Sequence, residues 1–67
     1  MNFDNNTYNK IKLLHELTRL NWFLEKHALN DAQMTGDQEF LVVLTKLNHN
    51  LTDNIEKMQQ SVCTIMQ

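Results

Sequence analysis

Residues 35–44 read TGDQEFLVVL, and they decide the fold because they join a helix start to the most apolar run of the chain. Thr35 and Gln38 stand three positions apart, which is the spacing of a capping box. Asp37 and Glu39 place negative charge in the turn that follows, where the helix dipole favours it. This pattern predicts a helix that begins near Asp37, with Thr35 as its cap.

The residues that follow repeat an apolar side chain every three or four positions, which is the period of one helix face. The chain contains no proline, and its only glycine is Gly36, so the sequence offers no helix breaker after the start. We therefore expect a helix over about residues 37–66. Its predicted apolar row consists of Leu44, Leu47, Leu51, Ile55, Met58, Val62 and Ile65.

A similar period runs through the first half of the chain and predicts a helix over about residues 8–29. Its row consists of Leu13, Leu17, Leu20 and Leu24. We expect residues 1–7 to be a polar, flexible lead-in, with Asn6 or Thr7 as the helix cap. Residues 30–36 are expected to form the connection, in which residues 30–33 could add an extra helical turn. Two helices joined in this way predict an all-α, antiparallel hairpin.

Five consecutive apolar residues, 40–44, point to almost every side of their helix. A single antiparallel helix covers only one of those sides, and the second predicted helix exceeds the first by about nine residues. A chain of 67 residues whose only cysteine is Cys63 also has no internal disulfide to stabilise it. We therefore predict that the hairpin completes a four-helix bundle, either by dimerisation or by docking on a partner protein.

Trp22 falls on the side of the first helix that faces away from the leucine row. Tryptophan on an otherwise polar helix face is typical of an interface anchor. The residues predicted to contact a partner are Trp22, Phe40, Leu41, Val42, Leu44, Leu51, Met58 and Val62. The predicted function is a small, non-enzymatic protein–protein interaction module, such as an adaptor, a co-chaperone or a regulatory subunit.

The charge and the apolar pattern argue against two other kinds of partner. The net charge is −2 and the basic residues are spread singly, so we expect no direct binding of nucleic acid. Residues 40–44 fall far short of the ~20 apolar residues that a membrane span needs. The first residues lack the pattern of a secretory signal, and a single cysteine is typical of a reducing compartment. We therefore predict a cytoplasmic protein.

The polar residues show no recognisable catalytic motif. None of the three histidines stands four positions from another histidine or from Cys63, which is the spacing of a helical zinc site. His27 is expected to face the dipole at the end of the first helix. Asp53 and Lys57 are spaced for an ion pair across one turn. We expect no cofactor, no metal and no small-molecule substrate.

An alternative is a small signalling regulator that acts on the phospho-aspartate of a partner, with Asn48, His49 or Asp53 as polar contributors. Residues 44–48, LTKLN, are similar in position to the Ser-Gln-Glu-Leu-Asp signature of the sporulation aspartyl-phosphate phosphatases, although only Leu47 matches. The co-chaperones of type III secretion needles and a class of small nucleoid modulators share the size and outline of this chain. We assign the chain to none of these families.

Overall fold

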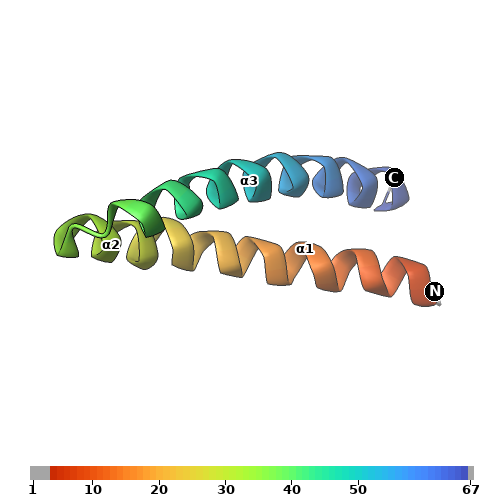
Figure 1. The fold of residues 1–67 in the computed structure, drawn as a ribbon. Coiled ribbons are helices and arrows are strands. Elements are labelled where there is room, and N and C mark those ends of the chain that lie inside the picture. Colours follow the sequence, from red (N-terminus) through yellow and green to blue (C-terminus); the bar gives the residue numbers. More distant parts are fainter. Residues whose placement is uncertain (1–3, 67) are drawn as a thin grey trace.

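The computed structural model describes residues 4–66, and their side chains as far as Cys63. Four elements follow one another: α1 (Asn5–Phe23), η1 (Leu24–Ala28), α2 (Leu29–Thr35) and α3 (Gln38–Met66). The first three form one continuous arm, and α3 runs back along it (Figure 1). The predicted all-α antiparallel hairpin is therefore confirmed. Residues 1–3 of the predicted lead-in and the side chain of Ile65 lie outside the described residues.

The first arm begins earlier than predicted because Asp4 caps it. The Asp4 backbone is extended, and its Oδ1 accepts a hydrogen bond from the backbone N–H of Thr7 at 2.7 Å. This hydrogen bond, together with one from the Thr7 side chain, stabilises the carboxylate and lowers the pKa of Asp4. Asn6 and Thr7, the predicted caps, therefore lie inside the first turn of α1.

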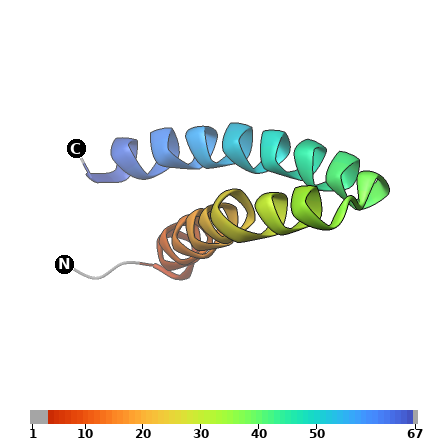
Figure 2. The ribbon, with the colours of Figure 1, turned by 90° about the vertical axis from the view of Figure 1, so that its left-hand side faces the viewer.

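One turn of the first arm is wider than the rest. Residues Leu24–Ala28 form a π-helical turn, in which the N–H of Leu29 donates to the carbonyl oxygen of Leu24, five positions back. The wider turn brings the rings of Trp22 and His27 together edge-on, with centroids 5.4 Å apart. A π turn bends a helix, and Figure 2 shows the arm changing direction near η1. His27 thus contacts an aromatic ring within the arm, and the prediction that it faces a helix end is wrong.

Residues 30–35, predicted to be part of the connection, are helical. α2 continues to Thr35, so only Gly36 and Asp37 connect the two arms. These six residues contain no helix breaker, and their continuation as a helix buries Ala32 in the core. The Thr35 hydroxyl donates to a carbonyl oxygen one turn back at 2.9 Å, so it does not cap the next helix as predicted.

The connection ends one helix and starts the next within two residues. Gly36 takes a left-handed conformation with φ +74°. Its N–H donates to the Gln33 carbonyl oxygen at 3.2 Å, and the N–H of Asp37 donates to that of Ala32 at 3.0 Å, which is a Schellman motif. Asp37 Oδ1 then accepts from the N–H of Phe40 at 3.1 Å, so Asp37 is the cap of α3.

The two arms are nearly equal in length because the first one continues to Thr35. Its three elements contain 19, 5 and 7 residues, against 29 in α3. The predicted excess of about nine residues in the second helix is therefore wrong. The hairpin is a rod of 50 × 15 × 15 Å, so any uncovered apolar surface lies along its sides.

The core is concentrated towards the turn. The buried residues are Leu24, Ala32, Leu44, Leu51 and Ile55. Figures 1 and 2 show the arms lying further apart towards the two termini. In α1, none of the residues is fully buried, and Leu14 and Leu17 pack against the core only in part.

Replacement of Gly36 by alanine tests the connection. A Cβ atom at this position would meet nothing within 4 Å, so the change adds only the cost of a left-handed alanine. We expect Gly36→Ala to keep the hairpin and to lower the free energy of unfolding by about 1 kcal/mol, measured by urea denaturation. Gly36→Asn is the matched control and should lose less, because asparagine tolerates this conformation. An alanine variant as stable as the original chain would contradict this account.

Candidate interaction surfaces

The two arms meet along a regular heptad seam. On α3, the residues turned towards the first arm are separated alternately by three and four positions. They are Leu41, Leu44, Asn48, Leu51, Ile55, Met58 and Val62. The prediction placed Leu47 in this row, but Leu47 is 40% exposed and Asn48 takes its place between the arms. That part of the predicted row is therefore wrong.

The first arm shows the same difference. Its half of the seam in α1 and η1 consists of Leu14, Leu17, Asn21 and Leu24. Leu13 and Leu20, which the prediction placed in the row, are about half exposed outside it. In both helices, therefore, an asparagine lies inside the seam and the leucine directly before it lies outside.

This rotational setting buries the fewest polar groups. If α3 were rotated so that the residues preceding the present seam residues lay between the arms, Asn50, Asn54 and Lys57 would be placed there. The same rotation of α1 would place Glu16 there. Burial of an unpaired amide or charge costs more than burial of one more leucine contributes. The observed seam needs only one asparagine from each helix, and these two asparagines face each other.

The side chains of Asn21 and Asn48 form a polar layer within the seam, which we call the asparagine layer. The Nδ2 of Asn48 donates to Oδ1 of Asn21 at 2.9 Å and to Oε2 of Glu25 at 2.8 Å. The Nδ2 of Asn21 lies 3.4 Å from Oγ1 of Thr52. Within the described part of the chain, no buried side-chain nitrogen or oxygen lacks a partner. A paired layer of this kind fixes the register of two helices, because a slip would leave the amides unpaired.

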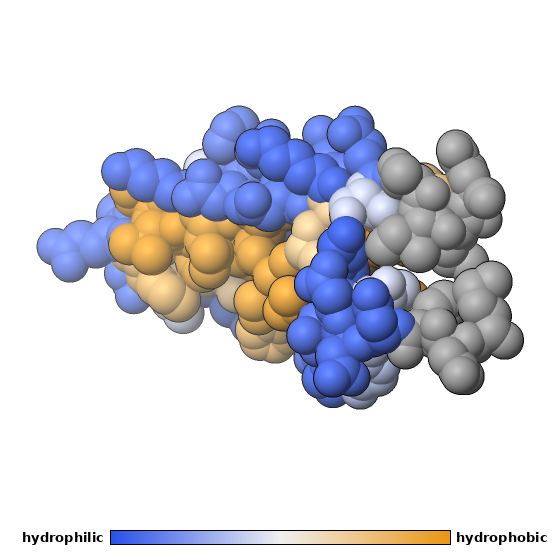
Figure 3. All heavy atoms as spheres, turned by 90° about the vertical axis from the view of Figure 1, so that its right-hand side faces the viewer, coloured by the Kyte–Doolittle hydropathy of each residue, from blue (hydrophilic) through white to orange (hydrophobic). Residues whose placement is uncertain are grey.

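An uncovered apolar face lies along one side of the hairpin. It consists of Leu13, Leu20, Phe23, Phe40, Val43 and Leu47, which are 40 to 58% exposed. Each of them directly precedes a seam residue. In a pair of antiparallel helices, the residues that precede the seam positions point to the same side of the pair from both helices. Figure 3 shows the resulting apolar band along the hairpin. None of its six members carries a charge, although Glu16 stands between Leu13 and Leu20 on α1. We call this surface the apolar face.

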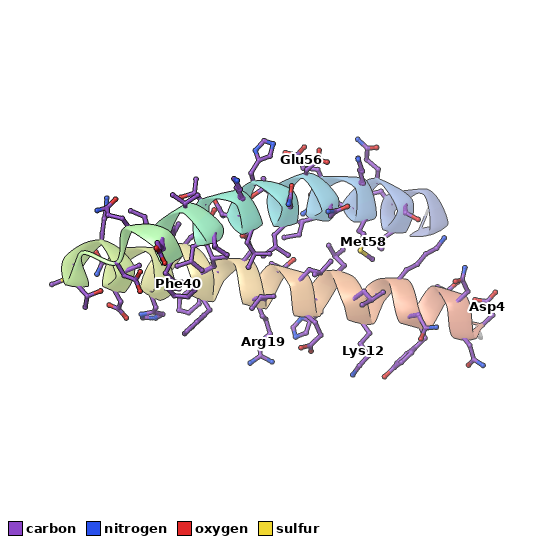
Figure 4. All side chains as sticks on the ribbon, viewed as in Figure 1. Asp4, Lys12, Arg19, Phe40, Glu56 and Met58 are labelled. Atoms are coloured by element: carbon purple, nitrogen blue, oxygen red, sulfur yellow. The ribbon has the colours of Figure 1, made fainter. Side chains whose placement is uncertain are left out.

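The predicted partner residues fall into different places. Five of them belong to the seam inside the hairpin: Leu41, Leu44, Leu51, Met58 and Val62. Figure 4 shows Met58 between the two arms, and Phe40 on the apolar face. Trp22 and Val42 are both exposed outside that face. The structure therefore groups Phe40 with leucines and a valine that the prediction did not select, and it does not bring Phe40 and Trp22 together.

A row of aromatic and basic side chains follows α1 on the side away from α3. It consists of Tyr8, Lys12, His15, Arg19 and Trp22, and we call it the outer row. These residues line two adjoining shallow depressions of about 450 and 390 Å³, which share His15. No carboxylate of the described chain lines either depression. Lys12 and Arg19 extend from α1 away from α3 (Figure 4).

Groups that could carry catalysis are scattered over the surface. Within the described residues, no group of three or more His, Cys, Asp and Glu side chains could hold a metal ion. Cys63 is an exposed thiol. Asp53 forms an exposed ion pair with Lys57 at 3.1 Å, which confirms the predicted pair. Over the same part of the chain, none of the helices has the length and apolar character to cross a bilayer.

The three comparisons with known proteins give no relative. No family model, no curated protein and no solved structure matches this chain. The seam, the apolar face and the outer row are therefore the features from which a function has to be inferred.

A double-mutant cycle measures the pairing in the asparagine layer. Asn21→Ala and Asn48→Ala each remove the hydrogen bond between the two amides, while Asn48 keeps Glu25 and Asn21 keeps Thr52 as a partner. Each should therefore lower the free energy of unfolding by about 1 kcal/mol. The double variant should lose less than the sum, with a coupling of about 1 kcal/mol, from urea denaturation at one protein concentration. Asn50→Ala, an exposed position on the same helix, is the control and should change little. Strict additivity would show that the two amides do not stabilise each other.

Proposed function

We propose that the chain is a non-enzymatic protein–protein interaction module whose apolar face packs against a second copy, so that two hairpins form a four-helix bundle. The observation that carries this proposal is the apolar face itself. It extends over both arms, and no other part of the described chain covers it. In this role the protein acts as an adaptor, a co-chaperone or a regulatory subunit.

The exposed area of the hairpin is large enough for an interface with a second copy. The chain exposes 5450 Å². A folded chain of 8.0 kDa is expected to expose about 4,450 Å², so the excess is about 1,000 Å². Each partner in a stable complex contributes about 800 Å² to the interface. One interface of ordinary size would therefore bring the exposed area of each copy close to the value expected for a folded chain.

A second copy also supplies burial that the hairpin lacks. The described core contains only five buried residues, and one of them is Ala32. Full burial of a leucine, valine or phenylalanine contributes about 1.5–3 kcal/mol, so covering the apolar face adds a substantial part of the stability of so small a chain. Chains of this length commonly depend on such additional packing.

The apolar face is suited to a copy of itself. Its members are uncharged, and the two charged residues in the same register, Glu16 on α1 and Lys57 on α3, have opposite signs, so two copies can meet without net repulsion between like charges. A two-fold axis places the same surface on both partners, which closes the assembly at two copies. Because the face spans two helices, the pair of hairpins surrounds one core with four helices.

Two neighbouring valines provide a matched test of this interface. Val43 belongs to the apolar face and is 58% exposed, whereas Val42 lies outside it and is 54% exposed. An unpaired charge buried in an interface costs several kcal/mol, so Val43→Glu should weaken dimerisation roughly 100-fold or more. Val42→Glu adds the same charge elsewhere and should leave the dimer intact. Sedimentation equilibrium over a range of concentrations gives the dissociation constants.

Two results would contradict the proposal. The first is a chain that stays monomeric at all concentrations and still unfolds cooperatively. The second is a dimer that is weakened equally by both glutamate variants. Circular dichroism of each variant serves as the check that the helices remain formed.

A further inference from the structure

We propose that the outer row of α1 is a second docking surface, and that it binds an acidic, amphipathic helix of another protein. The inference deepens the proposed function, because it names a class of partner for a surface that the two-hairpin bundle leaves free. Phe23 of the apolar face also lines the depression beside Trp22, but the outer row and the apolar face share no member and are centred on different sides of α1. The two surfaces can therefore be tested separately.

Charge is the first argument for an acidic partner. The chain as a whole carries a net charge of −2, but α1 contains Lys10, Lys12 and Arg19 against one acid, Glu16. Neither Lys12 nor Arg19 forms an ion pair with any described residue. With His15 between them and no carboxylate in the two depressions, these cations present a local positive potential on an acidic protein. Such a surface selects a partner of negative charge.

Apolar anchors stand at both ends of the row. Tyr8 and Trp22 carry large aromatic rings, and each of these residues is more than half exposed to solvent. The Trp22 ring already rests edge-on against His27 at 5.4 Å, so it is partly ordered before a partner arrives. An ordered aromatic anchor loses little side-chain entropy on binding, which is a property of interface hot spots.

The spacing of the row suits a helix as the partner. Its five members are separated by four, three, four and three positions, which is the same repeat that seats α1 against α3. From Tyr8 to Trp22 the row extends over about 21 Å, or four helical turns. A partner helix of roughly 15 residues would cover both aromatic ends with apolar side chains and place its carboxylates opposite Lys12 and Arg19.

Other negatively charged partners fit the row less well. Two cations neutralise too few phosphates for firm binding of nucleic acid, and the net charge of the whole chain opposes it. A helix that lies in a membrane surface inserts a continuous apolar face. The outer row instead has its charges in the middle, between two aromatic ends.

Trp22 is the only tryptophan of the chain, so its emission reports binding directly. The probe is a synthetic helical peptide of roughly 18 residues without tryptophan, with leucines at the anchor positions and glutamates opposite the cations. We expect a saturable blue shift of Trp22 emission, which weakens as salt is added. Arg19→Glu should weaken binding about tenfold, and Arg19→Gln several-fold. Lys46→Glu makes the same charge change on α3 and should leave binding within about twofold.

Three outcomes would overturn the inference. They are equal binding of a peptide with lysine in place of each glutamate, no effect of Arg19→Glu, and the same blue shift on vesicles of phosphatidylserine and phosphatidylcholine. The last result would assign the row to a membrane surface. The titration is repeated in the Val43→Glu background, where retained peptide binding without a dimer supports the outer row independently. If the original chain forms the dimer but does not bind the peptide, the outer row is refuted and the proposed bundle still stands.

Discussion

Asn21 and Asn48 face each other in the middle of an otherwise apolar seam, and their pairing sets the rotation of both helices. Because each asparagine occupies a position between the arms, the leucine before it, Leu20 or Leu47, has to lie outside. The seam thus exchanges the burial of two leucines, worth about 1.5–3 kcal/mol each, for a fixed register. The apolar face is the outward consequence of that exchange. A second copy that covers this face would recover the burial that the hairpin gives up.

The equal length of the two arms decides where apolar surface remains uncovered. If α3 extended beyond the first arm, its apolar end would be the natural contact surface. Continuation of the first arm to Thr35 gives every turn of α3 a neighbouring turn along the rod. What remains uncovered is a long strip on the side, and a strip that spans two helices is better matched by another hairpin than by a single helix. In the proposed assembly the contact surface would therefore be lateral, as in four-helix bundles.

α1 presents three different surfaces around its circumference. One meets α3, one belongs to the apolar face, and the third carries the aromatic and basic outer row. In the proposed bundle the outer row stays at the periphery of each copy, so a dimer would present it twice. Two equivalent sites on one particle raise the apparent affinity for a partner that is itself repeated.

The sequence by itself determined the helical content, the antiparallel hairpin, the position of the turn to within a few residues, and the Asp53–Lys57 ion pair. These features depend on local period, on the scarcity of glycine and proline, and on spacing along one helix, all of which can be seen in the printed chain. Only the tertiary structure decided which leucines are inside. A search for leucines at helical spacing selects Leu20 and Leu47. That the asparagines after them lie in the seam instead becomes clear only when the two helices are packed against each other. The extent of the first arm was also settled by packing, because burial of Ala32 against α3 favours a helix over residues that the sequence alone allows to form a loop.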